Sequence, residues 1–224
     1  MGMDPSTLTG FTFFVVNMAL LAAALFFWLE RDNVNPKWKT SLTVSGLVCF
    51  IAAVHYFYMR DAGGTDVVAI RYIDWLITVP LLMVELYIVL LAVTNVSSGV
   101  FKRLLGFTTL MLVFGYLGET QVISSTIGFV GGMLFWGLAL KEIWSGEAAD
   151  ANAGSKNAAG QYAYVNLKNI VTFGWLIYPA GYALGYFGGG VDMDLTNQVY
   201  NLADFVNKIL PGVIVWAAAK MDTK

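Results

Sequence analysis

An ionisable pair lies inside the last apolar stretch of the sequence. Lys208 follows Asp204 by one helical turn, within a run over 199–219 that is long enough to cross a bilayer. Residues spaced i, i+4 share a helix face, so the carboxylate and the ammonium can pair. A charge at this depth costs on the order of a few kcal/mol, and an ionisable residue there is by default a candidate for function. The alternative is a buried salt bridge that only joins two helices.

A second polar stripe runs along the third apolar stretch. Its members recur at spacings of three, four, four and three and share one helix face: Arg71, Asp74, Thr78, Leu82 and Glu85. Asp74 and Glu85 lie roughly 16 Å apart along such a helix. The flanking residues are apolar, so a solvated charged face does not explain the stripe. A polar seam that joins neighbouring helices is the structural alternative.

The charges of the two stretches balance. Arg71 and a positively charged Lys208 face Asp74 and Asp204, a set that sums to zero and is tolerable at low dielectric. Glu85 stands apart from any cation, and because burial penalises the charged form of a carboxyl, we expect it to be protonated at rest. An ionised carboxylate beside a cation, with a carboxylic acid beyond it, forms a proton relay with a built-in direction.

Composition places these residues in a membrane protein. The chain has 224 residues, of which 58% are hydrophobic and 12% charged, and its mean hydropathy is +0.66. Such a composition is too apolar for an ordinary soluble domain and indicates a polytopic membrane protein of the cell membrane. The net charge of −2 carries no nucleic-acid signature. The single cysteine, Cys49, excludes an internal disulfide, and we expect no metal site.

The predicted fold class is an all-α bundle of seven transmembrane helices that forms one domain over 1–224. Helices are expected because backbone polar groups within lipid must be satisfied inside the segment. The predicted spans are Phe11–Leu29, Thr40–Tyr58, Val67–Val93, Leu104–Leu117, Val122–Ile143, Tyr162–Phe187 and Val199–Ala219. Polar or glycine-rich breaks separate them, including Gly188–Gly190 and a loop from Glu142 to Asp150 that we expect to be a solvated linker.

Basic residues divide unevenly between the two sides of this bundle. One side collects Arg31, Lys37, Lys39, Lys102, Arg103, Lys141, Lys156, Lys220 and Lys224. The opposite side holds Arg60 together with Asp4, Asp61, Asp66, Glu119, Asp192 and Asp194. The positive-inside rule therefore predicts an amino terminus outside and a carboxyl terminus in the cytoplasm.

Several segments together resemble a known family. They are 30–32, 37–46, 71–76, 78–81, Trp175 with Tyr178 and Pro179, and 201–208, which has the sequence N-L-A-D-F-V-N-K. In this order and over nearly the whole chain they resemble the microbial (type 1) rhodopsins, and among them the proteorhodopsins. The resemblance implies a light-driven outward proton pump, which is an ion transporter and not an enzyme.

The resemblance assigns roles to the polar residues. Lys208 would carry all-trans retinal as a protonated Schiff base, with Asp74 as proton acceptor and Asp204 as second counterion. Glu85 would be the cytoplasmic proton donor, and Thr78 completes the Asp-Thr-Glu set of outward proton pumps. Arg71 belongs to the same charged set.

The resemblance also implies a pocket for the chromophore. Trp75, Trp136, Trp175 and Tyr178 resemble its aromatic walls, with Tyr182 and Tyr200 as second members. Flat apolar walls suit a rigid conjugated ligand, although aromatic residues at helical spacing are more often simply core. Leu82 matches the position that separates green-absorbing from blue-absorbing proteorhodopsins, and leucine predicts green.

Some positions extend or depart from the family pattern. The histidine that matches His55 pairs with the acceptor carboxylate in proteorhodopsins, which would make His55 and Asp74 titrate as a coupled pair. Pro211 stands where the family usually has another apolar residue, and it predicts a bend after Lys208. No carboxylate pair for proton release is obvious; Asp192, Asp194 and Glu119 are the candidates on that side.

Other functions remain open at this point. A photosensor with the same chromophore is the main rival, and Glu85 argues against it. Asp74 and Glu85 together disfavour a light-driven sodium or chloride pump. A seven-helix receptor or enzyme without chromophore would leave Lys208 purely structural. By resemblance we expect membrane lipid and retinal as partners and a homo-oligomer of five or six subunits, with no transducer and no nucleic acid.

Overall fold

The computed structural model describes residue 4 and residues 6–62, 66–187 and 192–223. Gly188–Gly190 and Lys224, which entered the sequence argument, lie outside these residues. The regular elements of the described part are helices: α1 Leu8–Glu30, η1 Arg31–Asn33, η2 Pro36–Trp38, α2 Lys39–Ala62, α3 Asp66–Leu91, α4 Ser98–Glu119, α5 Ser125–Ser145, α6 Glu147–Gly154, α7 Ala158–Asn169, η3 Ile170–Gly174, α8 Ile177–Phe187 and α9 Met193–Met221.

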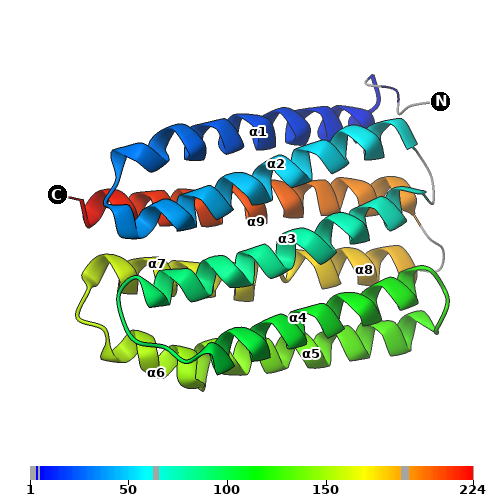
Figure 1. Cartoon of the computed structure of the whole chain (residues 1–224). Helices are drawn as coiled ribbons and strands as arrows, with labels where there is room; N and C mark the ends of the chain where they lie inside the picture. The colour runs from blue at the N-terminus through cyan, green and yellow to red at the C-terminus, as the bar shows by residue number, and fades with distance from the viewer. Residues whose placement is uncertain (1–3, 5, 63–65, 188–191, 224) are drawn as a thin grey trace.

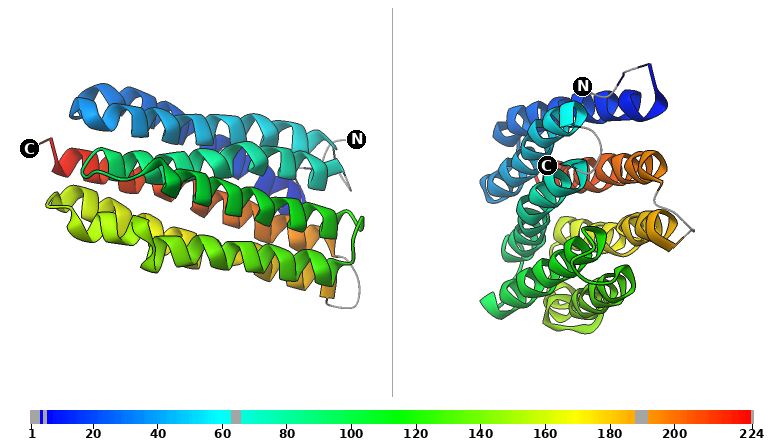
Figure 2. Two further views of the ribbon diagram at one scale, coloured as in Figure 1. Left: turned by 60° about the horizontal axis from the view of Figure 1, so that its bottom comes forward. Right: turned by 90° about the vertical axis from the view of Figure 1, so that its right-hand side faces the viewer.

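Seven helical segments are long and apolar enough to cross a membrane, as the sequence predicted. Their long axes run side by side, and the two chain ends lie at opposite ends of the bundle (Figure 1). Helix α1 packs against α2, and α4 packs against α5. Helices α3 and α9 lie between these two pairs (Figure 2). The two helices with the predicted ionisable residues therefore occupy the middle of the bundle.

None of the seven helices begins at the predicted residue, and the shifts are largest for the fourth and the last. The fourth starts at Ser98, because the Ser97 hydroxyl caps it by accepting a hydrogen bond from the Gly99 amide at 3.2 Å. The last starts at Met193, capped by the Asp192 carboxylate on the Leu195 amide at 3.0 Å. The fifth begins at Ser125 after its cap, Ser124. Hydropathy alone misses such polar first turns, because caps and not apolar residues define them.

The prediction of a solvated linker from Glu142 to Asp150 was wrong. Glu142 is buried in the last turns of α5, where Arg103 binds it through two nitrogens at 2.9 and 3.0 Å. Arg103 also contacts Glu147, the first residue of the short helix α6. This ion cluster folds the acidic segment back onto α4, which a one-dimensional charge pattern does not show.

The sixth span contains an irregular turn. Residues 170–174 form a π-helix between α7 and α8, closed by the Trp175 amide donating to the Ile170 carbonyl at 3.0 Å. Two carbonyls of this region accept bonds from neighbouring helices: Val171 from the Trp136 indole at 3.1 Å and Gly174 from the Asn207 amide at 2.9 Å. Such π-turns occur mostly at functional sites.

Helix α9 continues across Pro211, from Met193 to Met221. The bend expected at Pro211 stays a prediction. On the side of α2, the Cys49 thiol lies 3.4 Å from the Lys208 carbonyl oxygen, where it can donate a weak hydrogen bond. Cys49 is free and buried.

Candidate chromophore and proton-relay site

Four charged side chains meet at the centre of the bundle. The Lys208 ammonium forms an ion pair with Asp74 and lies 3.3 Å from Asp204 Oδ2. Arg71 Nη1 lies 3.7 Å from the same Asp204 oxygen. All four residues are at most 2% exposed. The structure thus brings together two cations and two anions, one of each from α3 and one of each from α9, as the sequence predicted.

The two aspartates of this cluster have different surroundings. Asp204 accepts hydrogen bonds from the hydroxyls of Tyr56 at 2.9 Å and Tyr178 at 2.8 Å, and from the Trp75 indole at 3.0 Å. These neutral donors stabilise its ionised form. Asp204 is therefore built to stay an anion.

The Asp74 carboxylate accepts fewer hydrogen bonds than that of Asp204. Its Oδ2 pairs with Lys208, while its Oδ1 is buried without a hydrogen-bond partner among the described residues. Thr78 donates at 2.9 Å to the Asp74 backbone carbonyl and not to the carboxylate. Because a buried carboxylate with few donors holds its charge poorly, Asp74 is the less stabilised anion of the two.

His55 lies close to this acceptor. Its Nδ1 is 3.7 Å from Asp74 Oδ1 but only 2.8 Å from the Ile51 carbonyl oxygen. The ring nitrogen therefore bonds to the backbone, and the predicted pairing with Asp74 is a proximity without a direct hydrogen bond. His55 is also partly exposed on the outer surface of the bundle.

Three supporting residues were not singled out as site residues from the sequence. Arg71 donates to Tyr56 at 3.1 Å, to Asn201 at 2.9 Å and to Asn197 at 3.3 Å. A signal for the asparagines existed, because Asn197 and Asn201 continue the spacing of Asp204 and Lys208 along one face of α9. Tyr56 lies on α2, and only the packing of helices brings it to Arg71.

Glu85 is buried on the same face of α3, near the carboxyl end of that helix. This end of α3 lies on the same side of the bundle as the end of α9 (Figure 1). Glu85 Oε1 is hydrogen-bonded to Ser45, whose Oγ also lies 3.1 Å from the Ser41 carbonyl. A hydroxyl has one proton, and a carbonyl can only accept. If Ser45 donates to Ser41, Glu85 must donate to Ser45, which requires a carboxylic acid. The other Glu85 oxygen has no partner in the described part of the chain.

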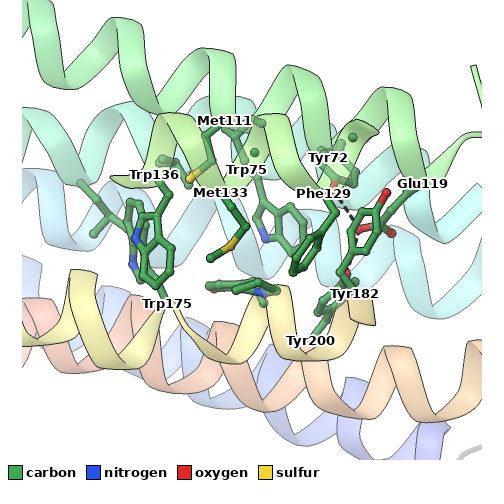
Figure 3. Close-up of a pocket in the computed structure, with 18 of the residues that line it drawn as sticks. Tyr72, Trp75, Met111, Glu119, Phe129, Met133, Trp136, Trp175, Tyr182 and Tyr200 are labelled. Atoms are coloured by element: carbon green, nitrogen blue, oxygen red, sulfur yellow. Dashed lines mark hydrogen bonds between the residues drawn. The ribbon is translucent and has the colours of Figure 1, made fainter. Parts of the chain in front are cut away.

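An apolar pocket leads away from Lys208 between the helices. It encloses about 780 Å³ of space outside the protein atoms, a volume that includes open solvent at its mouth. Figure 3 shows its aromatic walls, with Trp136 and Trp175 at one end and Tyr72, Tyr182 and Tyr200 toward the other. The predicted wall residues all line it: Trp75, Leu82, Trp136, Trp175, Tyr178, Tyr182 and Tyr200.

The comparisons with known proteins agree with this arrangement. The profile of the family described as "Bacteriorhodopsin-like protein" matches residues 7–221. The chain belongs to this family. Membership makes it a multi-pass protein of the cell membrane and not an enzyme, and the cofactor of the family is retinal, held on a lysine as a Schiff base.

Among relatives, the chain is 49% identical to the green-light absorbing proteorhodopsin of Gamma-proteobacterium EBAC31A08, over 99% of this chain and 90% of the relative. It is 47% identical to the blue-light absorbing proteorhodopsin of Gamma-proteobacterium Hot 75m4, with the same coverage. The crystal structure of the blue light-absorbing proteorhodopsin from Med12 superposes with a TM-score of 0.86 at 43% identity, covering 96% of this chain and 100% of that one.

The residues present fit the family's cofactor. A lysine lines the aromatic pocket, and its nitrogen is paired with a buried carboxylate that has one oxygen without a hydrogen-bond partner among the described residues. Flat aromatic walls match a conjugated chain, and the second carboxylate compensates the remaining charge.

Proposed function

We propose that this rhodopsin is a light-driven outward proton pump with all-trans retinal bound to Lys208. The observation that carries the proposal is the unequal pair of carboxylates at the Lys208 nitrogen, combined with a separate buried carboxyl, Glu85, on the same face of α3. Two proteins with similar folds are described as the proton pumping rhodopsin AR2 from Acetabularia acetabulum and the xanthorhodopsin light-driven ion pump.

The bound chromophore supplies a light-driven change of shape and proton affinity at the Lys208 nitrogen. Asp74 then takes the proton from that nitrogen, because Asp74 lacks the neutral donors that keep Asp204 ionised. Glu85 returns a proton to the nitrogen from the opposite side. Ser45 holds the Glu85 carboxyl in place until that step.

The proposal also includes the colour that the protein absorbs and the direction in which the chain lies in the membrane. Leu82 lies on the pocket wall, and its apolar side chain leaves the excited-state charge shift of a chromophore less opposed, which favours green absorption. The amino terminus lies outside the cell, which places Asp74 toward the outside and Glu85 toward the cytoplasm. The chain works as one domain and forms a ring of five or six subunits without a transducer.

The first test is external pH in a weakly buffered suspension of cells that express the chain with all-trans retinal, under green light. Acidification that a protonophore abolishes is the expected result. Lys208→Ala should give an uncoloured protein and no pH response. Circular dichroism checks that this variant is folded. A coloured Lys208→Ala protein would contradict attachment at Lys208.

Two other outcomes would replace the proposal. Alkalinisation that the protonophore enhances means that another ion moves and protons follow passively. A coloured protein without a pH change favours a sensor, a function named among the relatives in sensory rhodopsin-2 of Haloarcula vallismortis, at 32% identity over 85% of this chain and 80% of the relative.

A further inference from the structure

Lys168 is a cation that the site around Lys208 does not use. It belongs to α7, inside the sixth predicted span, and it is only partly exposed. Among the described residues, no carboxylate lies within ion-pair distance of its ammonium. A charge within a membrane span is costly without a partner, so an ionisable residue there is a candidate for function.

A tryptophan of the neighbouring helix holds this ammonium. Lys168 Nζ lies 3.9 Å from the centroid of the Trp144 ring, which belongs to the last turn of α5. The Trp144 indole donates to the Thr172 hydroxyl at 2.9 Å, and this bond fixes the ring against the sixth span. The face of an indole attracts a cation without accepting a conventional hydrogen bond. The ammonium is therefore held in place while its N–H donors stay available to another group.

A second lysine lies on the same side of α5. Lys141 precedes Trp144 by three residues, so the two share a helix face, and both are exposed. The acids Glu142 and Glu147 of this segment are bound by Arg103. In the part of the chain that the structure describes, Lys141 also forms no ion pair. Two lysines thus flank one indole, and no described carboxylate pairs with either of them.

The surface next to these lysines, toward the middle of the bundle, is apolar. Leu134 and Gly137 continue the exposed face of α5, and a Cβ on Gly137 would meet nothing within 4 Å. On the sixth span, Phe173 and Leu176 are 65% and 50% exposed. Exposed apolar side chains of a membrane span face lipid chains. A cationic end and an apolar end therefore follow each other along the helices, in the order of a phospholipid headgroup and its acyl chains.

The height of the two lysines in the bundle agrees with this order. The end of α5 and the start of α7 lie at the same end of the bundle (Figure 1). The Tyr164 hydroxyl of α7 donates to the Ile143 carbonyl of α5 at 2.8 Å and joins the helices there. Tryptophan rings are enriched at the headgroup level of a membrane, and lysine side chains reach toward it. Trp144, 47% exposed, is placed as such an interfacial residue.

We propose that Lys141, Trp144 and Lys168 form a binding site for the anionic headgroup of a phospholipid. The two ammonium groups bind the phosphate oxygens, and one acyl chain lies on the apolar surface beside Leu134 and Phe173. Basic pockets between membrane helices bind anionic headgroups in this manner. A soluble phosphate would gain only the charge attraction, whereas a lipid also gains the apolar contact. The inference goes beyond the proposed pump and depends on neither light nor proton transfer.

The test is native mass spectrometry of the retinal-bound protein in detergent, with phosphatidylglycerol or phosphatidylcholine of identical acyl chains added. Wild type should prefer phosphatidylglycerol, by about fivefold for each lysine near the headgroup. The double variant Lys141→Gln, Lys168→Gln should lose this preference. The double variant Lys141→Arg, Lys168→Arg keeps both charges and should retain it. Lys156→Gln removes an exposed lysine from the loop before α7; it is the matched control and should behave as wild type.

Equal preference for phosphatidylglycerol in wild type and in the double glutamine variant would overturn the inference. Displacement of the lipid by soluble glycerol phosphate would also overturn it, because the lysines would then recognise a soluble anion. A changed number of subunits with unchanged lipid binding would make this face a contact between copies of the chain instead. If the double variant forms no pigment, Lys141→Gln alone decides. A preference reduced about fivefold supports the site, and a wild-type preference refutes it.

Discussion

Asp74 and Asp204 show how identical side chains acquire different chemistry. Both face the Lys208 nitrogen, but Asp204 receives three neutral donors, whereas one Asp74 oxygen has no hydrogen-bond partner among the described residues. The difference arises from Tyr56, Trp75 and Tyr178, which point to one carboxylate only. In the proposed pump, the hydrogen-bond donors and not the charge distinguish the acceptor, since both aspartates pair with Lys208.

Asp74→Asn removes the proposed proton acceptor. We expect pumping to be lost and the absorption to shift to the red, because the positive charge on the Lys208 nitrogen loses its nearest anion. Removing one partner of a buried ion pair costs about 3–5 kcal/mol, so the pigment should also bleach at lower temperature. Absorption spectra and light-induced pH changes measure both effects. Residual pumping at wild-type rate would show that Asp204 accepts the proton instead.

Glu85→Gln removes the proposed proton donor but keeps the shape of the side chain. Colour should be preserved, while reprotonation of the Lys208 nitrogen slows by about a hundredfold, the scale of general acid catalysis. Time-resolved absorption measures this step, and azide or low pH should restore its speed by supplying protons directly. Ser45→Ala is the comparison variant, with a smaller slowing because the acid remains but its position is less fixed. Recovery at full speed in Glu85→Gln would remove Glu85 from the relay.

At the scale of elements, the π-turn of the sixth span is held from both sides. Trp136 of α5 and Asn207 of α9 bond to its Val171 and Gly174 carbonyls. Asn207 is the neighbour of Lys208 in sequence, and Trp136 lines the pocket. Any change of shape in the pocket therefore acts directly on the turn that joins α7 to α8.

Gly174→Ala tests this contact. A Cβ at position 174 would clash with the Asn207 side-chain amide, so we expect a loss of about 1–3 kcal/mol in stability, seen as bleaching of the pigment at lower temperature. Gly137→Ala is the matched control: nothing lies within 4 Å of its Cβ, and the change should be neutral or slightly stabilising. Equal bleaching temperatures for the two variants would show that the turn adapts freely.

A second contact between elements holds the carboxyl end of α9 in place. Asp222 pairs with Lys37 at 2.6 Å and accepts hydrogen bonds from Trp38 and Asn157, each at 2.8 Å. Burial by itself would raise the pKa of Asp222, but these donors outweigh burial and hold its pKa below the ordinary value. A carboxyl with a depressed pKa stabilises the fold at neutral pH and loses that contribution as the pH falls through its folded-state pKa.

Asp222→Asn should therefore lower the melting temperature at pH 7 by about 2–4 °C, the scale that ~1 kcal/mol produces in a chain of this size. The deficit should shrink as the pH falls below ~4, where wild type loses the same charge. Thermal melts of the two proteins across this pH range measure it. A deficit that is independent of pH would mean that the carboxylate charge does not contribute.

At the scale of the whole molecule, function depends on how the bundle lies in the membrane. Its two ends differ: the start of α1 and the end of α4 lie at one end, and the end of α9 and the start of α4 lie at the other (Figure 1). The proposed relay runs between these ends, so the proposed direction of pumping follows from the orientation of the chain.

The orientation of the chain in the membrane can be tested with introduced cysteines. Cys49 is buried, so introduced thiols can be labelled selectively. In intact cells, a membrane-impermeant maleimide should label Asp194→Cys, which is exposed near the amino-terminal end, and should reach Asp150→Cys, exposed at the other end, only after lysis. The reversed pattern would reverse the proposed direction of the relay.

The sequence by itself determined the class of fold, the seven spans and the two stripes around Lys208 and Asp74. Helical period and hydropathy are local properties, and a residue such as Glu85 inside an apolar run is visible without coordinates. The tertiary structure decided which carboxylate is supported, that Ser45 binds Glu85, that Lys168 lies over the Trp144 ring and that Asn207 binds the π-turn. Each of these contacts joins helices far apart in the chain, and no one-dimensional pattern specifies how those helices are rotated against one another.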